Sequence, residues 1–230
     1  MNQYIIANWK ANQNRQQTYE FIRQFLALTA TSPLPQDLQL VVCPPAVFYL
    51  EFVGKSLPLA AGLQDISVFA GGAYTGELTA QNLTGIEPAF VIVGHSERRR
   101  EFGETNELIV RKCEQVWSLG ATPIVCFDEP EAASLSQLLQ VHAGKSMILA
   151  YEPVSAISTS GSAGNLDPQA LNQQLVGFRQ LFPGMPIIYG GSVKPENAGS
   201  YAGICDGLLV GSASLKAESF VGIARNFAHQ

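Results

Sequence analysis

The sequence predicts an α/β protein, a (β/α)8 barrel in which eight parallel strands alternate with helices. Eight short apolar runs rich in β-branched residues recur along the 230 residues. Segments with the three-and-four spacing of a buried helix face lie between these runs. The runs are continuously apolar, which is typical of strands buried on both faces of a parallel sheet. We expect a single domain that covers residues 1–230.

The eight apolar runs are the expected strands. In chain order they are Tyr4–Ala7, Leu38–Val42, Leu57–Leu63, Ala89–Val93, Ala121–Cys126, Met147–Tyr151, Pro186–Tyr189 and Gly207–Val210. An open, doubly wound sheet is the alternative arrangement for such strand–helix repeats. No Gly-x-Gly-x-x-Gly follows the first run, and this absence disfavours the open sheet.

Helical periodicity is clearest over residues 18–26, 108–117 and 171–178. Asp167 followed by Pro168 is a typical helix start, because Asp caps a free backbone N–H and Pro suits the first turn. Gly120 is well suited to end the second of these helices. The connection Gln64–Thr79 is longer than usual. The segment Pro130–Lys145 leaves room for only a short helix.

Composition narrows the class of protein. Hydrophobic residues make up 47% of the chain and charged residues 14%, which suits a large core. The net charge of −5 provides no basic field for nucleic acid or an anionic membrane. No apolar run reaches the ~20 residues of a membrane span, and the first residues lack the pattern of a signal peptide. We therefore expect a cytoplasmic protein that binds neither nucleic acid nor membrane.

The cysteines and histidines suggest neither disulfides nor a metal site. Cys43, Cys113, Cys126 and Cys205 are widely spaced and form no Cys-x-x-Cys pair. We expect free thiols, as in a reducing compartment. The three histidines show no metal-ligand spacing, so no zinc site is expected.

Polar residues follow five of the expected strands. They are Asn8 and Lys10 after the first, His95 and Glu97 after the fourth, Glu152 after the sixth, Gly191 and Ser192 after the seventh, and Gly211 and Ser212 after the eighth. In a barrel of this kind the carboxyl ends of the strands form the active-site rim. Taken singly, each residue has an ordinary alternative: a solvated loop acid, a structural histidine or a simple turn. Their convergence on one rim favours a shared function.

Each of these residue types has a chemical rationale. Glu152 can abstract a carbon-bound proton, while His95 donates a hydrogen bond to a carbonyl that becomes an enediolate oxygen. Lys10 supplies a fixed positive charge for an anionic substrate. The glycine-rich turns after the seventh and eighth strands expose backbone N–H groups, as in a barrel phosphate site. Glu152 is followed by a run of small residues, which is the layout of a base beneath a movable lid.

At these residues the chain closely resembles the triosephosphate isomerase family. The matching motifs are Ala7-Asn8-Trp9-Lys10, Cys43-Pro44-Pro45, residues 72–77, residues 93–99, Phe102-Gly103-Glu104, residues 150–154, residues 189–193 and residues 206–215. They occur in family order across nearly the whole chain. The resemblance implies a TIM barrel that interconverts dihydroxyacetone phosphate and D-glyceraldehyde 3-phosphate, in glycolysis and gluconeogenesis, with no metal or organic cofactor.

The resemblance also implies a role for each site residue. Glu152 matches the general base, His95 the electrophile and Lys10 the cation that faces substrate. Asn8 is the neighbour of that lysine in the site, and Glu97 is an acid near it. The phosphate-binding positions are Ser158, Ser192, Gly191, Gly211 and Ser212. The family is homodimeric, and Thr75 matches the threonine that one subunit inserts beside its partner's active site.

The chain departs from the family around the expected lid and phosphate site. Ser155 stands where the family has Trp, and Ser158 and Ser160 stand where it has Gly. Ser212 replaces a further Gly after the eighth strand, and Asp128 replaces one after the fifth. Two alternatives to an active isomerase follow from these departures. One is a barrel that binds phosphosugars without turnover, and the other is an isomerase for a different small phosphosugar.

Overall fold

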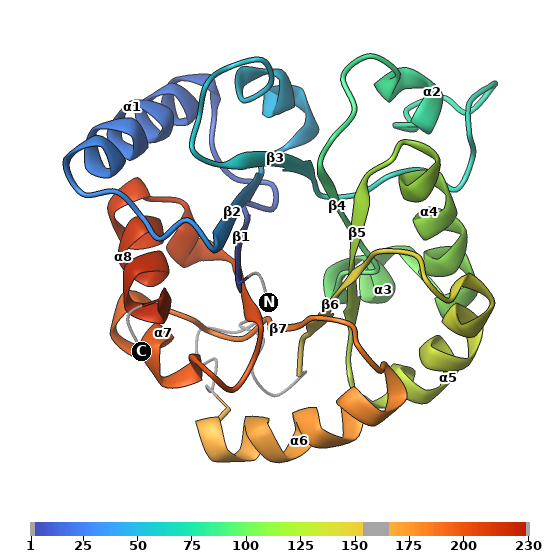
Figure 1. Ribbon diagram of the computed structural model, residues 1–230. Coiled ribbons are helices and arrows are strands. Elements are labelled where there is room, and N and C mark those ends of the chain that lie inside the picture. Colours follow the sequence, from blue (N-terminus) through green and yellow to red (C-terminus); the bar gives the residue numbers. More distant parts are fainter. Residues whose placement is uncertain (1–2, 154–165, 229–230) are drawn as a thin grey trace.

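Eight strands form a closed parallel barrel in which each strand pairs with the next along the chain (Figure 1). The structure is a computed structural model that describes residues 3–153 and 166–228. The strands are β1 (Gln3–Asn8), β2 (Leu38–Cys43), β3 (Ala60–Leu63), β4 (Phe90–Val93), β5 (Thr122–Phe127), β6 (Ile148–Tyr151), β7 (Ile187–Tyr189) and β8 (Gly207–Val210). The parallel pairing of β1 with β8 closes the barrel, so the predicted barrel is confirmed and the open sheet is excluded.

Helices surround the barrel on its outside (Figure 1). The α-helices are α1 (Arg15–Thr31), α2 (Ala80–Leu83), α3 (Ser96–Phe102), α4 (Asn106–Ser118), α5 (Glu129–Leu139), α6 (Pro168–Leu181), α7 (Pro195–Ala198) and α8 (Ala217–Ala228). Short 3-10 helices are η1 (Ala46–Glu51), η2 (Gln140–His142), η4 (Gly199–Tyr201) and η5 (Ser212–Ser214). After β3 and after β7 the expected helix is a single α-helical turn, α2 and α7 respectively.

The strand predictions are correct in number and order but differ at their ends. The third strand begins at Ala60 and not at Leu57. Leu57 instead donates its backbone N–H to the Lys55 carbonyl in a turn, and Pro58 has no N–H to give to a sheet. The fifth strand, Thr122–Phe127, lies one residue later than predicted. Apolar content alone therefore marks where a strand is buried but not where its hydrogen bonding starts.

The predicted helix boundaries agree with local chemistry. The Asp167 side chain accepts a hydrogen bond from the backbone N–H of Gln169 at the start of α6, with Pro168 as the first helical residue. Asn14 caps α1 in a reciprocal arrangement with Gln17. Gly120 follows α4 with a φ of +71°, a backbone conformation that favours glycine. Helix α5 has 11 residues, and all but its first, Glu129, lie in the segment expected to hold only a short helix.

Two apolar layers fill the structure. Side chains inside the barrel include Ile6, Ile92, Ile124, Ala150 and Ile188, all at most 1% exposed. The second layer lies between the strands and the helices and contains the neighbours of these residues along each strand. Successive side chains in a strand point to opposite faces. This alternation explains why the expected strands are apolar at every position.

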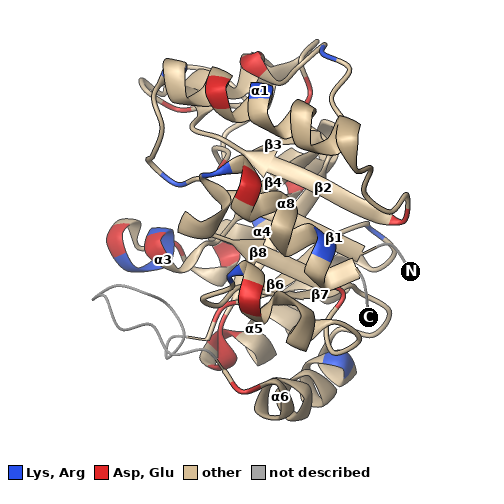
Figure 2. Cartoon of the chain, turned by 90° about the vertical axis from the view of Figure 1, so that its left-hand side faces the viewer, with Lys and Arg blue, Asp and Glu red and all other residues tan. Residues whose placement is uncertain are grey.

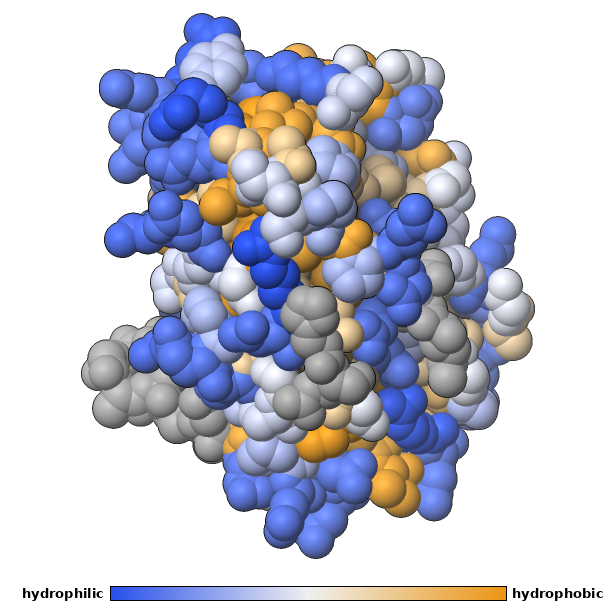
Figure 3. All heavy atoms as spheres, turned by 60° about the vertical axis from the view of Figure 1, so that its left-hand side comes forward, coloured by the Kyte–Doolittle hydropathy of each residue, from blue (hydrophilic) through white to orange (hydrophobic). Residues whose placement is uncertain are grey.

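The face of the molecule seen in Figure 3 is largely hydrophilic, with separated apolar areas. No helix among the described residues has the length and apolar character needed to cross a bilayer. All four cysteines are buried and unpaired. Within residues 3–153 and 166–228, no cluster of His, Cys, Asp and Glu is suited to hold a metal ion.

Candidate active site

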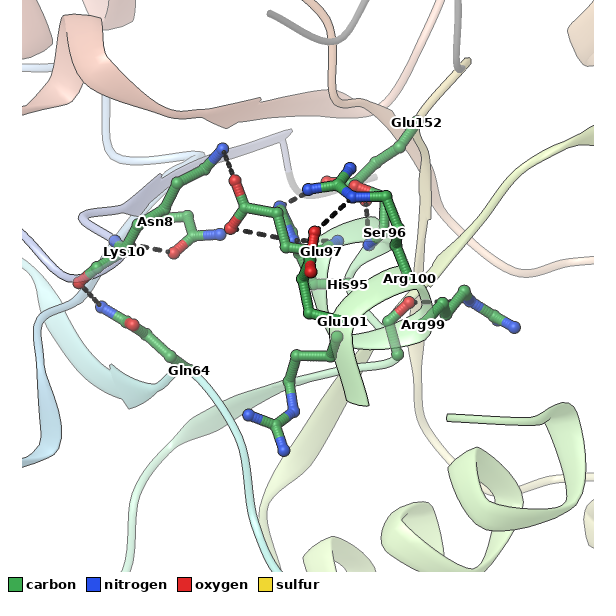
Figure 4. Close-up of polar contacts among 12 residues, drawn as sticks. Asn8, Lys10, Gln64, His95, Ser96, Glu97, Arg99, Arg100, Glu101 and Glu152 are labelled. Atoms are coloured by element: carbon green, nitrogen blue, oxygen red, sulfur yellow. Dashed lines mark hydrogen bonds and ion pairs between the residues drawn. The ribbon is translucent and has the colours of Figure 1, made fainter. Parts of the chain in front are cut away.

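Four titratable side chains form a line of polar contacts across the rim at the carboxyl ends of the strands (Figure 4). Glu152 Oε1 lies 3.0 Å from His95 Nε2. Glu97 Oε2 lies 3.6 Å from His95 Nδ1, and Glu97 Oε1 lies 2.7 Å from Lys10 Nζ. The structure therefore brings together residues from the ends of β1, β4 and β6, as expected from the strand order.

His95 precedes α3, a helix dense in charged residues (Figure 2). Its Nδ1 accepts a hydrogen bond from the backbone N–H of Glu97 at 3.2 Å. In the neutral ring this places the proton on Nε2, the atom that faces Glu152. Burial alone would lower the pKa of His95, but the adjoining Glu152 carboxylate outweighs burial, and the pKa of His95 is raised.

Glu152 follows β6 and is 4% exposed. Its backbone N–H donates to the Phe127 carbonyl at 2.9 Å. Carboxylate Oε2 accepts the backbone N–H of Ser96 at 3.1 Å, while Oε1 contacts His95. Burial alone would raise the pKa of Glu152, but these two contacts hold it below its ordinary value. Glu152 is thus an ionised carboxylate, the form that a general base requires.

Lys10 follows β1 in an unusual conformation, with a φ of +52°. Its backbone N–H donates to Asn8 Oδ1 at 3.1 Å. Gln64 Nε2 donates to the carbonyl oxygens of Lys10 and Cys43, each at 2.9 Å. The buried Asn8 therefore acts on the backbone of Lys10, and the ammonium of Lys10 points to Glu97.

The glycine-rich turns after β7 and β8 lie on the same rim. A Cβ added at Gly191 would lie 2.1 Å from Tyr189 Oη, so this position admits only glycine without displacement. A Cβ at Gly190 would lie 2.8 Å from Glu152 Cγ. A Cβ at Gly211 would lie 3.8 Å from Lys10 Cε, the one atom within 4 Å among the described residues other than its chain neighbours. The turn after β8, which contains Gly211 and Ser212, is therefore a neighbour of the site lysine.

The remaining predicted residues are Ser192, Ser158 and Thr75. Ser192 follows Gly191, and its carbonyl accepts from Asn197 Nδ2 at 3.1 Å. Ser158, together with Ser155 and Ser160, lies outside the described residues. Thr75 is exposed near the tip of the long connection after β3, where Tyr74 stacks on Phe69 with a centroid distance of 3.6 Å.

A cavity of about 400 Å³ opens beside the line of polar contacts. Its lining includes the site residues Asn8, Lys10, His95 and Glu97. Residues of the long connection and of α3, such as Glu77 and Phe102, complete the lining. Glu152 and the turns after β7 and β8 are not part of its lining.

The structure adds one residue that was not among the predicted site residues. Gln64 directly follows β3 and holds the backbone of Lys10. It satisfies the same positional rule as the other site residues, a polar side chain at the carboxyl end of a barrel strand. Reading the residues after all eight strands, and not after five, would have found it.

The comparisons with known proteins agree with this geometry. The family model described as "Triosephosphate isomerase" matches residues 3–227. Proteins named triosephosphate isomerase from Idiomarina loihiensis and Acinetobacter baylyi are each 35% identical, over 96% and 98% of this chain and 96% of each relative. One of the same name from Acidiphilium cryptum is 37% identical over 97% of this chain and 98% of its own length. The chain belongs to the triosephosphate isomerase family.

Proposed function

We propose that this chain interconverts dihydroxyacetone phosphate and D-glyceraldehyde 3-phosphate, with Glu152 as the base and His95 as the electrophile. The observation that carries the assignment is the direct contact of Glu152 Oε1 with His95 Nε2 at 3.0 Å, on a ring whose Nδ1 is occupied by a backbone N–H. The family is one of aldose–ketose isomerases.

The proposed reaction moves protons only. The Glu152 carboxylate removes a proton from C1 of dihydroxyacetone phosphate, and the electron pair of that C–H bond forms the C1–C2 double bond of an enediolate. The same carboxyl group then delivers a proton to C2, while the hydroxyl proton passes from the C1 oxygen to the C2 oxygen. Because no electrons leave the substrate, these steps call for no redox or organic cofactor.

His95 supports this reaction by hydrogen bonding to the substrate oxygens. The Glu152–His95 contact has to open before a substrate oxygen can reach Nε2. When it opens, the carboxylate no longer raises the pKa of His95, and burial then favours the neutral ring. A neutral histidine beside a glutamate base is the established pattern for this family. Lys10 contributes positive charge at the same rim, where its ammonium pairs with Glu97.

We assign the substrate phosphate to the turns after β7 and β8. Backbone N–H groups around Gly191, Ser192, Gly211 and Ser212 are candidate donors, and Ser158 belongs to the same proposal. Support comes from the absence of a Cβ at Gly191 and Gly211 and from the position of Gly211 against the Lys10 side chain. Ser212 retains its N–H and adds a hydroxyl.

A coupled isomerase assay of the purified chain tests the activity. We expect turnover of D-glyceraldehyde 3-phosphate, and a loss of about 10²–10⁴-fold for Glu152→Gln. Glu218→Gln, on the exposed first turn of α8, is the matched control and should retain full turnover. Binding of 2-phosphoglycolate without any turnover would instead favour a phosphosugar-binding barrel. Activity only on another phosphosugar would replace the substrate assignment.

We also propose that the chain forms a homodimer through the connection around Thr75. Phe102 and Val47 are 69% and 78% exposed. Residues of η1, α3 and the long connection line the cavity beside Lys10, which can accept a loop from a second copy. The unpaired cysteines suit a reducing compartment, and we propose the cytoplasm as the place of action.

A further inference from the structure

Three side chains form a hydrogen-bonded ring behind the proposed base. The Tyr151 hydroxyl has one proton to donate and shares it between two acceptors, Glu129 Oε1 at 2.9 Å and Gln174 Oε1 at 2.5 Å. Gln174 Nε2 donates to Glu129 Oε1 at 2.5 Å. The three residues come from β6, from the first residue of α5 and from the middle of α6. The ring therefore joins three consecutive strand and helix elements at the level of the active-site rim.

Tyr151 is the fixed member of this ring. It is fully buried, and its ring packs against Phe127 and Phe178. A buried hydroxyl without a partner is costly, so its position depends on the acceptors that α5 and α6 provide. Burial, together with the Glu129 carboxylate, raises the pKa of Tyr151, and the hydroxyl remains a donor throughout the working pH range.

Tyr151 and Glu152 share one peptide unit, and this unit is held on both sides. The Glu152 N–H donates to the Phe127 carbonyl at 2.9 Å, and the Tyr151 carbonyl accepts from the Gly190 N–H at 2.8 Å. Ala150 points into the barrel and Tyr151 outward to the helices. Alternation therefore directs Glu152 back toward the rim. Because Tyr151 and Glu152 share this peptide unit, the backbone links the position of the Tyr151 side chain to the orientation of the Glu152 carboxylate.

Gln174 has a chemical role that few side chains can fill. Its carboxamide accepts from the Tyr151 hydroxyl and donates to the Glu129 carboxylate at the same time. A carboxylate in its place would repel Glu129, and an apolar side chain would leave both partners short of a contact. On an amphipathic helix such a glutamine would otherwise be an ordinary half-buried polar residue.

We propose that Gln174 is a positioning residue for the general base, acting on Glu152 through Tyr151 and Glu129. The proposal rests on the proposed function, because it concerns the placement of the base in that reaction. Gln174 does not touch the substrate, so its contribution belongs to the proton-transfer step and not to substrate affinity.

The first experiment compares Gln174→Met with Gln173→Met. Methionine has nearly the length of glutamine but neither donates nor accepts strongly, and Gln173 is an exposed residue of the same helix. We expect kcat of Gln174→Met to fall roughly 3- to 30-fold, below the ~100-fold cost of a 1 Å misplacement, with KM nearly unchanged. Gln173→Met should match the wild type. Tyr151→Phe removes the hydroxyl from the other side of the ring and should reproduce the loss in kcat.

A charge variant gives a readout that a merely structural role would not produce. Gln174→Glu places a second carboxylate against Glu129, and the two repel unless they share a proton. We expect its kcat, relative to the wild type at each pH, to recover as the pH falls from about 8 to about 5.5. For Gln173→Glu, on the exposed face of the same helix, kcat relative to the wild type should stay constant over this pH range.

The outcomes separate this inference from the proposed function. An inactive, folded wild-type chain would overturn both. An active wild type with equal kcat in Gln174→Met and Gln173→Met would overturn the positioning role alone. The positioning role would also be overturned if the kcat of Gln174→Glu, relative to the wild type, did not change with pH. Should Gln174→Met fail to fold, Tyr151→Phe and Gln174→Glu carry the same comparison.

Discussion

Lys10 shows how much local structure a single site residue requires. A non-glycine residue in the left-handed region costs about 1–2 kcal/mol. Here Asn8 accepts the Lys10 N–H, and Gln64 donates to the Lys10 carbonyl, so both ends of the residue are held. The strained backbone points the ammonium across the rim to Glu97. The surrounding hydrogen bonds therefore offset the cost of this backbone conformation and fix the position of the Lys10 ammonium.

The His95–Glu152 pair should make stability depend on pH in a defined window. The folded pKa of Glu152 is lowered from 4.5, so its contribution is present above about pH 4.5 and is lost as the pH falls through the folded value. The pKa of His95 is raised from 6.5, so its contribution is present below about pH 6.5 and is lost as the pH rises through the folded value. In urea unfolding, the free energy of unfolding of the wild type should exceed that of Glu152→Gln by more near pH 5.5 than near pH 8.5. A constant difference across this range would contradict the pairing.

Two Gly→Ala variants should have opposite effects on stability. At Gly191 the new methyl group would lie 2.1 Å from Tyr189 Oη, and that hydroxyl accepts the Leu166 N–H at 3.1 Å. We expect Gly191→Ala to lose about 1–3 kcal/mol of unfolding free energy, and activity with it. Gly177 lies inside α6, and apart from its chain neighbours and the backbone of its own helix, no atom of the described residues lies within 4 Å of an added Cβ. Gly177→Ala should gain about 0.5–1 kcal/mol. Urea titration measures both, and equal changes would refute the steric argument.

At the scale of elements, the sequence predicts what depends on burial and local capping. The strand order, the cap at Asp167 and the stop at Gly120 followed from such rules and agree with the structure. The rim residues Lys10, His95 and Glu152 were predicted to converge, because parallel strands deliver their carboxyl ends to one side. The ring around Gln174 was not predicted, because its partners are 45 and 23 residues away and no periodic pattern links them.

A partly buried ion cluster connects α3, α4 and the long connection after β3. Lys112, on α4, contacts Asp65 and Glu104, each at 2.5 Å. Arg98, on α3, contacts the same two acids at 2.9 and 2.6 Å. Burial opposes the charge on Glu104, yet the two cations hold the pKa of Glu104 below its ordinary value. Asp65 follows Gln64, so the cluster also supports the residue that holds Lys10.

Removing the buried cation should therefore be costly. Lys112→Met leaves two acids without one of their partners in a region where Lys112 is 5% exposed. We expect a loss of about 3–5 kcal/mol in unfolding free energy at neutral pH. Lys216→Met, an exposed lysine before α8, should change stability little. Urea unfolding of both variants makes the comparison, and equal stabilities would show that Arg98 alone suffices.

At the scale of the whole molecule, the site exists only when the barrel is closed. Lys10 leaves β1, Glu152 leaves β6, and the turn carrying Gly211 leaves β8, so most of the chain lies between the first and last of them. The pairing of β8 with β1 brings Gly211 close to Lys10, so that a Cβ added at Gly211 would lie 3.8 Å from Lys10 Cε. A partly folded chain would bring together some of these groups but not all of them. Isomerase activity therefore requires the complete, closed barrel.

A charge introduced at one face of the chain should dissociate the proposed homodimer, whereas the same charge at another face should leave it intact. Phe102→Asp and Val176→Asp make nearly the same chemical change at apolar residues that are 69% and 56% exposed. Phe102 ends α3 beside the cavity, whereas Val176 lies on α6, across the barrel from the long connection (Figure 1). An aspartate buried in an interface without a partner is destabilising by several kcal/mol. Light scattering should therefore give the mass of one 24.8 kDa chain for Phe102→Asp and twice that mass for Val176→Asp. A wild type that scatters as a single chain, or two variants with equal mass, would rule out this interface.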